Sequence, residues 1–170
     1  MSDSGPVVTD SGPIIALAKV GHLDVLGKLF GTVLVPGAVF REVAWQDVGR
    51  PGAIELSTAS WAVRIPLETP PDALLAGDLG PGEAEAITLA VQRHARLLLL
   101  DDRRARRIAE VAYRLRVKGV AVILVAAKKH RLIGSVKSLL LEICDKGYYV
   151  ADNIIDRALI EAGEKGSSKD

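Results

Sequence analysis

Residues 6–18 read PVVTDSGPIIALA, and this stretch decides the fold. Its apolar run ends directly in Asp10, after which Ser11 is the expected helix N-cap and Pro13 lies in the first turn. A short apolar run followed by an acid and a helix is typical of a buried parallel strand. Ligands of open α/β sheets bind at the C-terminal ends of such strands. Asp10 is therefore the first candidate site residue.

A second stretch has the same form. Residues 95–102 read ARLLLLDD, so that another apolar run ends in acids. We assign Asp101 to the pocket because it directly follows the run. We assign Asp102 to the N-cap of the next helix, which runs to about residue 116. The two strands would then bring Asp10 and Asp101 to the same edge of the sheet.

Two further acids lie in stretches with helical periodicity. Glu42 flanks the apolar residues Val39 and Val43 on its helix. Glu83 heads an apolar stripe with i+3/i+4 spacing and lies in the first helical turn, where the helix dipole favours negative charge. Glu85 points to a different face of that helix, where we expect it to be solvated. The helix dipole alone remains an alternative explanation for the position of Glu83. For Glu42 the alternative is an ordinary solvated helical glutamate.

Strand and helix patterns alternate along the chain, which predicts an α/β fold with a mainly parallel sheet of four to five strands. Residues 68–82 are rich in proline and glycine and are predicted to be a loop, and residues 166–170 a short flexible tail. The apolar run at 121–130 fits either a strand or a helix. The strands are expected at 7–10, 32–35, 62–67, 95–101 and 117–120, and the helices at 11–18, 22–29, 36–43, 51–60, 83–94, 102–116, 121–130, 135–146 and 151–163.

Composition limits the class of protein. The chain has 170 residues, of which 49% are hydrophobic and 25% charged, with a net charge of +1, so we expect one globular domain spanning residues 1–170. It lacks a signal-peptide pattern and an apolar run of about 18 residues, so we expect a cytoplasmic protein that does not span a membrane. Cys144 is the only cysteine, which excludes an intramolecular disulfide and a cysteine-rich metal site.

Several carboxylates at one edge of a sheet repel one another unless they are partly protonated or share a cation. Oxygen ligands suit Mg²⁺ or Mn²⁺, and such a site indicates phosphoryl chemistry. The three histidines offer no competing site, because they lie in separate helical stretches without the spacing of metal ligands: His22, His94 and His130.

Four segments together resemble the PIN-domain family. Residues 7–18 resemble its opening strand and helix, and residues 36–43 (PGAVFREV) resemble its second acidic motif. Residues 82–87 (GEAEAI) and 99–102 (LLDD) resemble the third and fourth motifs. The resemblance spans about residues 6–163 and is strongest to small prokaryotic PIN proteins predicted to bind nucleic acid, which are similar to VapBC-type toxins. It implies a three-layer α/β/α fold.

The resemblance also implies a site and an activity. It places a Mg²⁺ or Mn²⁺ site, which is also catalytic, on Asp10, Glu42, Glu83 and Asp101. Ser11 matches a hydroxyl that contacts the metal, its water or a phosphate, and Asp102 is a fifth acidic candidate. Glu83 stands where many PIN domains have aspartate. The implied activity is that of a metal-dependent endoribonuclease that leaves a 5′-phosphate, as the homodimeric toxin of a pair with a small antitoxin protein.

Arginines crowd the helix that follows Asp101. Arginine suits bidentate contacts to phosphate, so this face is a candidate RNA-binding surface, although a solvated face paired with Glu110 explains it equally well. With 4% aromatic residues, few rings are placed for base stacking, and we expect binding led by phosphate and shape. The candidate RNA-binding residues are Arg103, Arg104 and Arg107.

Other phosphate-handling folds fit less well. A receiver domain would have a lysine at the end of a late strand, and residues 117–120 are not followed by a well-placed lysine. A haloacid-dehalogenase-type phosphatase would have a second aspartate at the position of Gly12. A dinucleotide-binding protein would have a glycine-rich turn in place of Ser11, Gly12 and Pro13. A noncatalytic PIN-like module that binds RNA or a protein partner remains open as the alternative.

Overall fold

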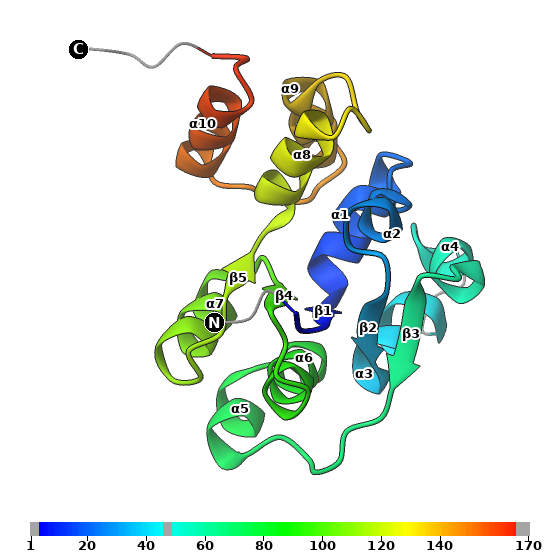
Figure 1. Ribbon diagram of the computed structural model, residues 1–170, viewed down its shortest axis with the longest axis vertical. Coiled ribbons are helices and arrows are strands. Elements are labelled where there is room, and N and C mark those ends of the chain that lie inside the picture. Colours follow the sequence, from blue (N-terminus) through cyan, green and yellow to red (C-terminus); the bar gives the residue numbers. More distant parts are fainter. Residues whose placement is uncertain (1–3, 46–48, 166–170) are drawn as a thin grey trace.

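The computed structural model describes residues 4–45 and 49–165, and it contains a five-stranded, all-parallel sheet in the order β3-β2-β1-β4-β5 (Figure 1). The strands are β1 (Val7–Thr9), β2 (Val33–Pro36), β3 (Ala62–Ile65), β4 (Leu97–Leu99) and β5 (Val117–Lys118). The predicted α/β class and parallel sheet are confirmed.

Helices cover both faces of the sheet and make a three-layer α/β/α fold (Figure 1). The core on one face contains residues of α1, α2, α3, η1, α4, α8, α9 and α10, and the core on the other contains residues of α5, α6 and α7. Helix α10 packs on α8 and α9. Within the described ranges, no helix has both the length and the apolar character needed to cross a bilayer. The helices are α1 (Ser11–Lys19), α2 (Val25–Phe30), α3 (Gly37–Phe40), the π-helix η1 (Arg41–Trp45), α4 (Ala53–Thr58), α5 (Ala73–Asp78), α6 (Pro81–Gln92), α7 (Arg103–Val111), α8 (Val120–Lys129), α9 (Val136–Asp145) and α10 (Asp152–Glu161).

Alternation along the short strands builds the two cores. Val7 and Val8 are both buried, but Val7 packs with the α1 and α8 side and Val8 with the α6 and α7 side. Successive side chains of a strand point to opposite faces, so a strand covered on both sides must be apolar throughout. This is why residues 97–100 read LLLL.

The order in which the chain adds strands to the sheet reverses between β1 and β4. The chain runs outward from β1 through β2 to β3, and then returns to place β4 and β5 on the other side of β1. The Asp10 N–H donates to the Leu99 carbonyl at 2.9 Å and so extends the pairing of these two strands. Ligands of open α/β sheets bind at such a switch point. Asp10 and Asp101 follow the two strands that flank it.

Local differences from the predicted elements have physical causes. Asp10, not Ser11, is the N-cap of α1, and its carboxylate accepts the Gly12 N–H at 3.5 Å. The predicted loop at 68–82 contains α5, which Asp72 caps by accepting the Leu75 N–H at 3.0 Å. The ambiguous run at 121–130 is helical. The predicted flexible tail at 166–170 lies outside the described residues.

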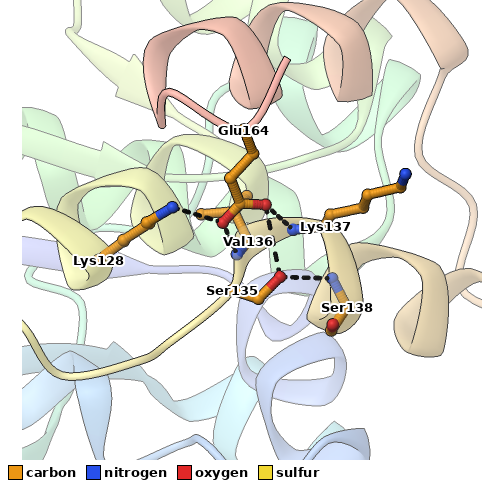
Figure 2. A network of polar contacts seen from close by, with 6 residues as sticks. All are labelled: Lys128, Ser135, Val136, Lys137, Ser138 and Glu164. Carbon is orange, nitrogen blue, oxygen red and sulfur yellow. Dashed lines mark hydrogen bonds and ion pairs between the residues drawn. The ribbon is translucent and has the colours of Figure 1, made fainter.

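The Glu164 carboxylate links the C-terminal helices α8, α9 and α10 through hydrogen bonds (Figure 2). Glu164, which follows α10, accepts hydrogen bonds from Lys128 Nζ at 2.7 Å and from the N–H groups of Val136 and Lys137 at 2.7 and 2.8 Å. Ser135 Oγ lies 3.4 Å from the same carboxylate. Burial favours a higher pKa, but these donors outweigh it and lower the pKa of Glu164 to about 2. The contacts join α10 to α8 and to the N-terminus of α9.

The Glu164→Gln variant is expected to lower the free energy of unfolding by about 1–3 kcal/mol at neutral pH. Because the pKa of Glu164 is lowered from 4.5 to about 2, its stabilisation is complete above the unfolded pKa and disappears as the pH falls towards 2. Urea unfolding of wild type and variant, at neutral pH and near pH 3, measures the difference. The exposed Glu161→Gln is the matched control. A Glu164→Gln effect of equal size at both pH values would contradict the charge-based account.

Candidate active site

A pocket of about 390 Å³ opens at the C-terminal edge of the sheet. It lies between the start of α1, the α3–η1 segment and the start of α6. Three of the four acids expected to bind metal line it together. The lining residues are Asp10, Ser11, Ala38, Arg41, Glu42, Arg50, Gly80, Pro81, Gly82 and Glu83.

Asp10 is buried but keeps one oxygen without a hydrogen-bond partner. The residue is 4% exposed, and its Oδ2 accepts the Gly12 N–H at 3.5 Å. Among the described residues, Asp10 Oδ1 is the buried side-chain oxygen or nitrogen atom that lacks a hydrogen-bond partner. Buried polar atoms are nearly always satisfied, and exceptions indicate a ligand, water or strain. Asp10 Oδ1 is therefore placed to contact a bound group.

Gly82 lies beside the carboxylates of both Asp10 and Glu42. A methyl group at Gly82 would lie 2.8 Å from Glu42 Oε2 and 3.3 Å from Asp10 Oδ1. Glycine at this position leaves the space into which both oxygens point. Glu42 is presented by the π-helix η1, and such wide turns occur frequently at functional sites.

Glu83 completes the acidic group from the first turn of α6. Its Oε2 accepts the Gly80 N–H at 3.2 Å. Burial, followed by the negative charges of Asp102 and Glu42, raises the pKa of Glu83 against the effect of that hydrogen bond. Burial, together with the charges of Glu83 and Glu42, raises the pKa of Asp10 to about 7. The three carboxylates thus share one region of negative potential, which a cation would offset.

The donor chemistry of the pocket fits a hard divalent cation. The acids supply only oxygen, as Mg²⁺ and Mn²⁺ prefer, and Asp10 Oδ1 is unpartnered. Across residues 4–45 and 49–165, however, no three His, Cys, Asp or Glu side chains form a group ready to hold a metal ion. Asp10, Glu42 and Glu83 would therefore have to draw closer around the ion.

Asp101 lies outside the pocket lining. Its Oδ1 accepts the Val120 N–H at 3.0 Å, and its Oδ2 accepts the Tyr148 hydroxyl at 2.7 Å. Burial raises the pKa of Asp101, although both hydrogen bonds oppose the rise. Asp102 caps α7, as expected, by accepting the Ala105 N–H at 2.8 Å. The role of Asp101 as a metal ligand stays a prediction.

Tyr148 is a residue of this region that the sequence did not reveal. It lies in the segment between α9 and α10, and a methyl group at Gly12 would lie 2.8 Å from its hydroxyl oxygen. The same methyl group would lie 3.8 Å from both Asp10 Oδ2 and Asp101 Cβ, so Tyr148 reaches the space between the two acids. Nothing in the local sequence marks it.

The arginines nearest the acids differ from those expected. Arg41 and Arg50 line the pocket, and Arg41 could have been noticed because it directly precedes Glu42. Arg104 pairs with Asp78 at 3.0 Å on the exposed side of α7. The three arginines predicted to bind RNA are exposed on α7 and lie outside the pocket lining: Arg103, Arg104 and Arg107.

Glu85 was expected to be solvated, and this prediction is wrong. Its Oε2 accepts the Ala38 N–H at 2.8 Å, and its Oε1 lies 3.7 Å from Arg41 Nη2. The side chain is only 21% exposed, because α6 packs against α3. Glu85 therefore holds the start of α3 and positions Arg41 at the rim of the pocket.

Comparison with known proteins gives one match. A family model described as a PIN domain matches residues 6–164. No curated protein and no solved structure matches the chain. The matched segment contains the whole sheet and every residue of the acidic pocket.

Proposed function

The chain belongs to the PIN-domain family, and we propose that it is a Mg²⁺- or Mn²⁺-dependent endoribonuclease whose site is the acidic pocket. Proteins of this family are generally nucleases and usually use divalent metals. The observation that supports the proposal most strongly is the buried, unpartnered Oδ1 of Asp10, which lies with Glu42 Oε2 beside Gly82. A buried carboxylate among other acids is costly unless a ligand compensates it.

The residues of the pocket would divide the work. Asp10, Glu42 and Glu83 would hold the cation, which when bound lowers the pKa of a water and offsets charge on a phosphodiester. Glu83 is half-buried at the start of α6 and lines the pocket, so its carboxylate is placed to orient the attacking water and accept its proton. Arg41 at the rim suits contact with a phosphate oxygen.

The remaining site residues complete this proposal. The buried Ser11 lines the pocket beside Asp10, where its hydroxyl would contact a phosphate or a water. Asp101 and Asp102 would contribute negative charge from the end of β4, with Asp101 held by Tyr148. We further propose, from the resemblance to VapBC-type toxins, a cytoplasmic homodimer that a small antitoxin protein inhibits.

A noncatalytic RNA-binding or protein-interaction module is the second candidate. Both Asp101 oxygens are engaged by Val120 and Tyr148, which leaves three acids in the pocket lining instead of four. If Asp101 serves only to cap the start of α8, it is not a metal ligand. The pocket would then lack the fourth acid and would bind its ligand without cutting it.

Cleavage of RNA by the purified protein tests the proposal. After removal of metal with EDTA, addition of Mn²⁺ or Mg²⁺ is expected to produce fragments that carry a 5′-phosphate, identified by their direct ligation. A parallel preparation of Asp10→Asn controls for contaminating ribonuclease. Equal cleavage in EDTA, or intact total RNA after incubation with Mn²⁺, would overturn the proposed activity. The second result would favour the noncatalytic module.

A further inference from the structure

A cluster of aromatic and cationic side chains lies next to the acidic pocket. We call it the aromatic shelf, and it consists of Phe40, Trp45 and Arg64. The Arg64 guanidinium carbon lies 4.4 Å from the Trp45 ring centroid and 5.8 Å from the Phe40 centroid. The two rings meet edge to face, with centroids 5.8 Å apart. These distances are within the range of cation–π contacts and aromatic pairs.

The shelf is open on its outer side. Trp45 is 52% exposed although Arg64 and Phe40 contact its ring, and Arg64 is itself exposed. A tryptophan that is held in place by its neighbours but half exposed offers a preformed stacking surface. Every base has a π-face, so exposed aromatic rings and stacked arginines are the usual platforms for single-stranded nucleic acid.

Arg41 connects the shelf to the pocket. A methyl group at Gly37 would lie 3.3 Å from Arg41 Nη1 and 3.6 Å from Arg64 Nη2, so the two guanidinium groups converge over Gly37. Pairing of β2 with β3 brings Arg64 there, because Arg64 pairs with Val35 in the sheet. Arg41 also lines the acidic pocket. Two cationic groups therefore extend from the pocket to the aromatic shelf.

We infer that the aromatic shelf binds a base of single-stranded RNA beside the phosphodiester to be cut, while Arg41 and Arg64 contact the backbone phosphates between shelf and pocket. This inference rests on the proposed function and adds the path of the substrate. It adds base stacking to the binding led by phosphate and shape that the low aromatic content had predicted. The α7 arginines then contribute only general attraction.

Fluorescence anisotropy of a short fluorescein-labelled single-stranded RNA, in EDTA so that nothing is cut, tests the inference. Trp45→Leu is expected to weaken binding at least about fivefold, and Trp45→Phe to restore most of the affinity. Arg64→Ala is expected to weaken binding and to reduce the salt dependence, whereas the matched Arg104→Ala on α7 has a smaller effect. Circular dichroism and thermal unfolding show that each variant is folded.

A second probe separates stacking from charge. Inorganic polyphosphate has no bases, so Trp45→Leu is expected to leave the inhibition constant of polyphosphate, corrected for the changed RNA affinity, as in wild type. Arg64→Ala is expected to raise that constant. Wild-type affinity for RNA in both Trp45→Leu and Arg64→Ala would overturn the inference and indicate a protein partner for the shelf. Failure of wild type to bind the RNA would overturn it as well.

The outcomes for the two proposals are distinguishable. Shelf-dependent binding without cleavage in Mn²⁺ would support the shelf and overturn the nuclease. Metal-dependent cleavage with full RNA affinity in Trp45→Leu would support the nuclease and overturn the shelf.

Discussion

The Asp10→Asn variant is expected to lose cleavage by about 100-fold or more while its metal-free form unfolds at the same temperature as wild type or a higher one. Burial raises the pKa of Asp10 from 3.8 to about 7. The folded protein thus binds this proton more tightly than the unfolded chain does, and stability falls as the pH rises from about 4 to 7. Above pH 7 the buried charge costs on the order of a few kcal/mol.

Asparagine removes that charge but preserves the fold. It has nearly the same shape as aspartate and can still accept the Gly12 N–H as the N-cap of α1. An asparagine whose oxygen accepts the Gly12 N–H places its NH2 group where the unpartnered Asp10 Oδ1 lies, and an NH2 group does not bind a cation. Greater stability with lost activity would show that Asp10 is present for function at a cost to folding.

Cleavage assays and thermal unfolding, each in EDTA and in Mn²⁺, measure both effects. Asp72→Asn is the matched control, because Asp72 also caps a helix, by accepting the Leu75 N–H, but lies outside the pocket lining. The control is expected to cleave like wild type and to keep the stabilisation by Mn²⁺. An Asp10→Asn variant that unfolds at a lower temperature in EDTA would indicate a structural role for Asp10.

Gly82→Ala is expected to reduce cleavage by about 10- to 100-fold although every carboxylate is retained. The new methyl group would lie 2.8 Å from Glu42 Oε2 and 3.3 Å from Asp10 Oδ1. Glu42 can swing away because its carboxylate is the end of a flexible side chain, so the fold is kept. Alanine also favours the helix by about 0.5–1 kcal/mol. The methyl group thus fills the space between the carboxylates and moves Glu42 away from Asp10, while the free energy of unfolding is maintained.

Gly80→Ala, at the N-cap of the same helix, is the matched control. A methyl group at Gly80 would have Glu83 Oε2 as its nearest neighbour, at 3.6 Å, which is an ordinary contact. Cleavage by this variant is expected to remain near the wild-type rate. Equal activity of Gly80→Ala and Gly82→Ala, with both proteins folded, would show that the gap between Glu42 and Asp10 is not where the reaction occurs.

The sequence could predict those parts of the fold that depend on local patterns. Asp10 follows a buried strand, and Asp102 caps a helix, because strand period, helix entry and capping act over a few residues. The helix α5 was missed because its surroundings are rich in proline and glycine. Its signal was Asp72, an N-cap residue three positions before the Leu75 N–H that it accepts.

Contacts between distant segments could not be predicted. Asp101 is held by Tyr148, 47 positions later in the chain, and no periodicity reports such a contact. The periodicity of one helix predicts a solvated Glu85, whereas α3 covers the side chain and the Ala38 N–H donates to it. The aromatic shelf likewise depends on strand pairing, which brings Arg64 to Trp45.

Calorimetric titration with Mn²⁺ tests the central claim, that the acidic pocket is a metal site, without knowledge of the RNA. Wild type is expected to bind Mn²⁺, and Glu83→Gln to bind it at least about tenfold more weakly. Glu85→Gln is the matched control two residues along α6, where glutamine can still accept the Ala38 N–H. It is expected to bind Mn²⁺ like wild type. The same Mn²⁺ affinity in all three proteins, or no binding by wild type, would contradict the account.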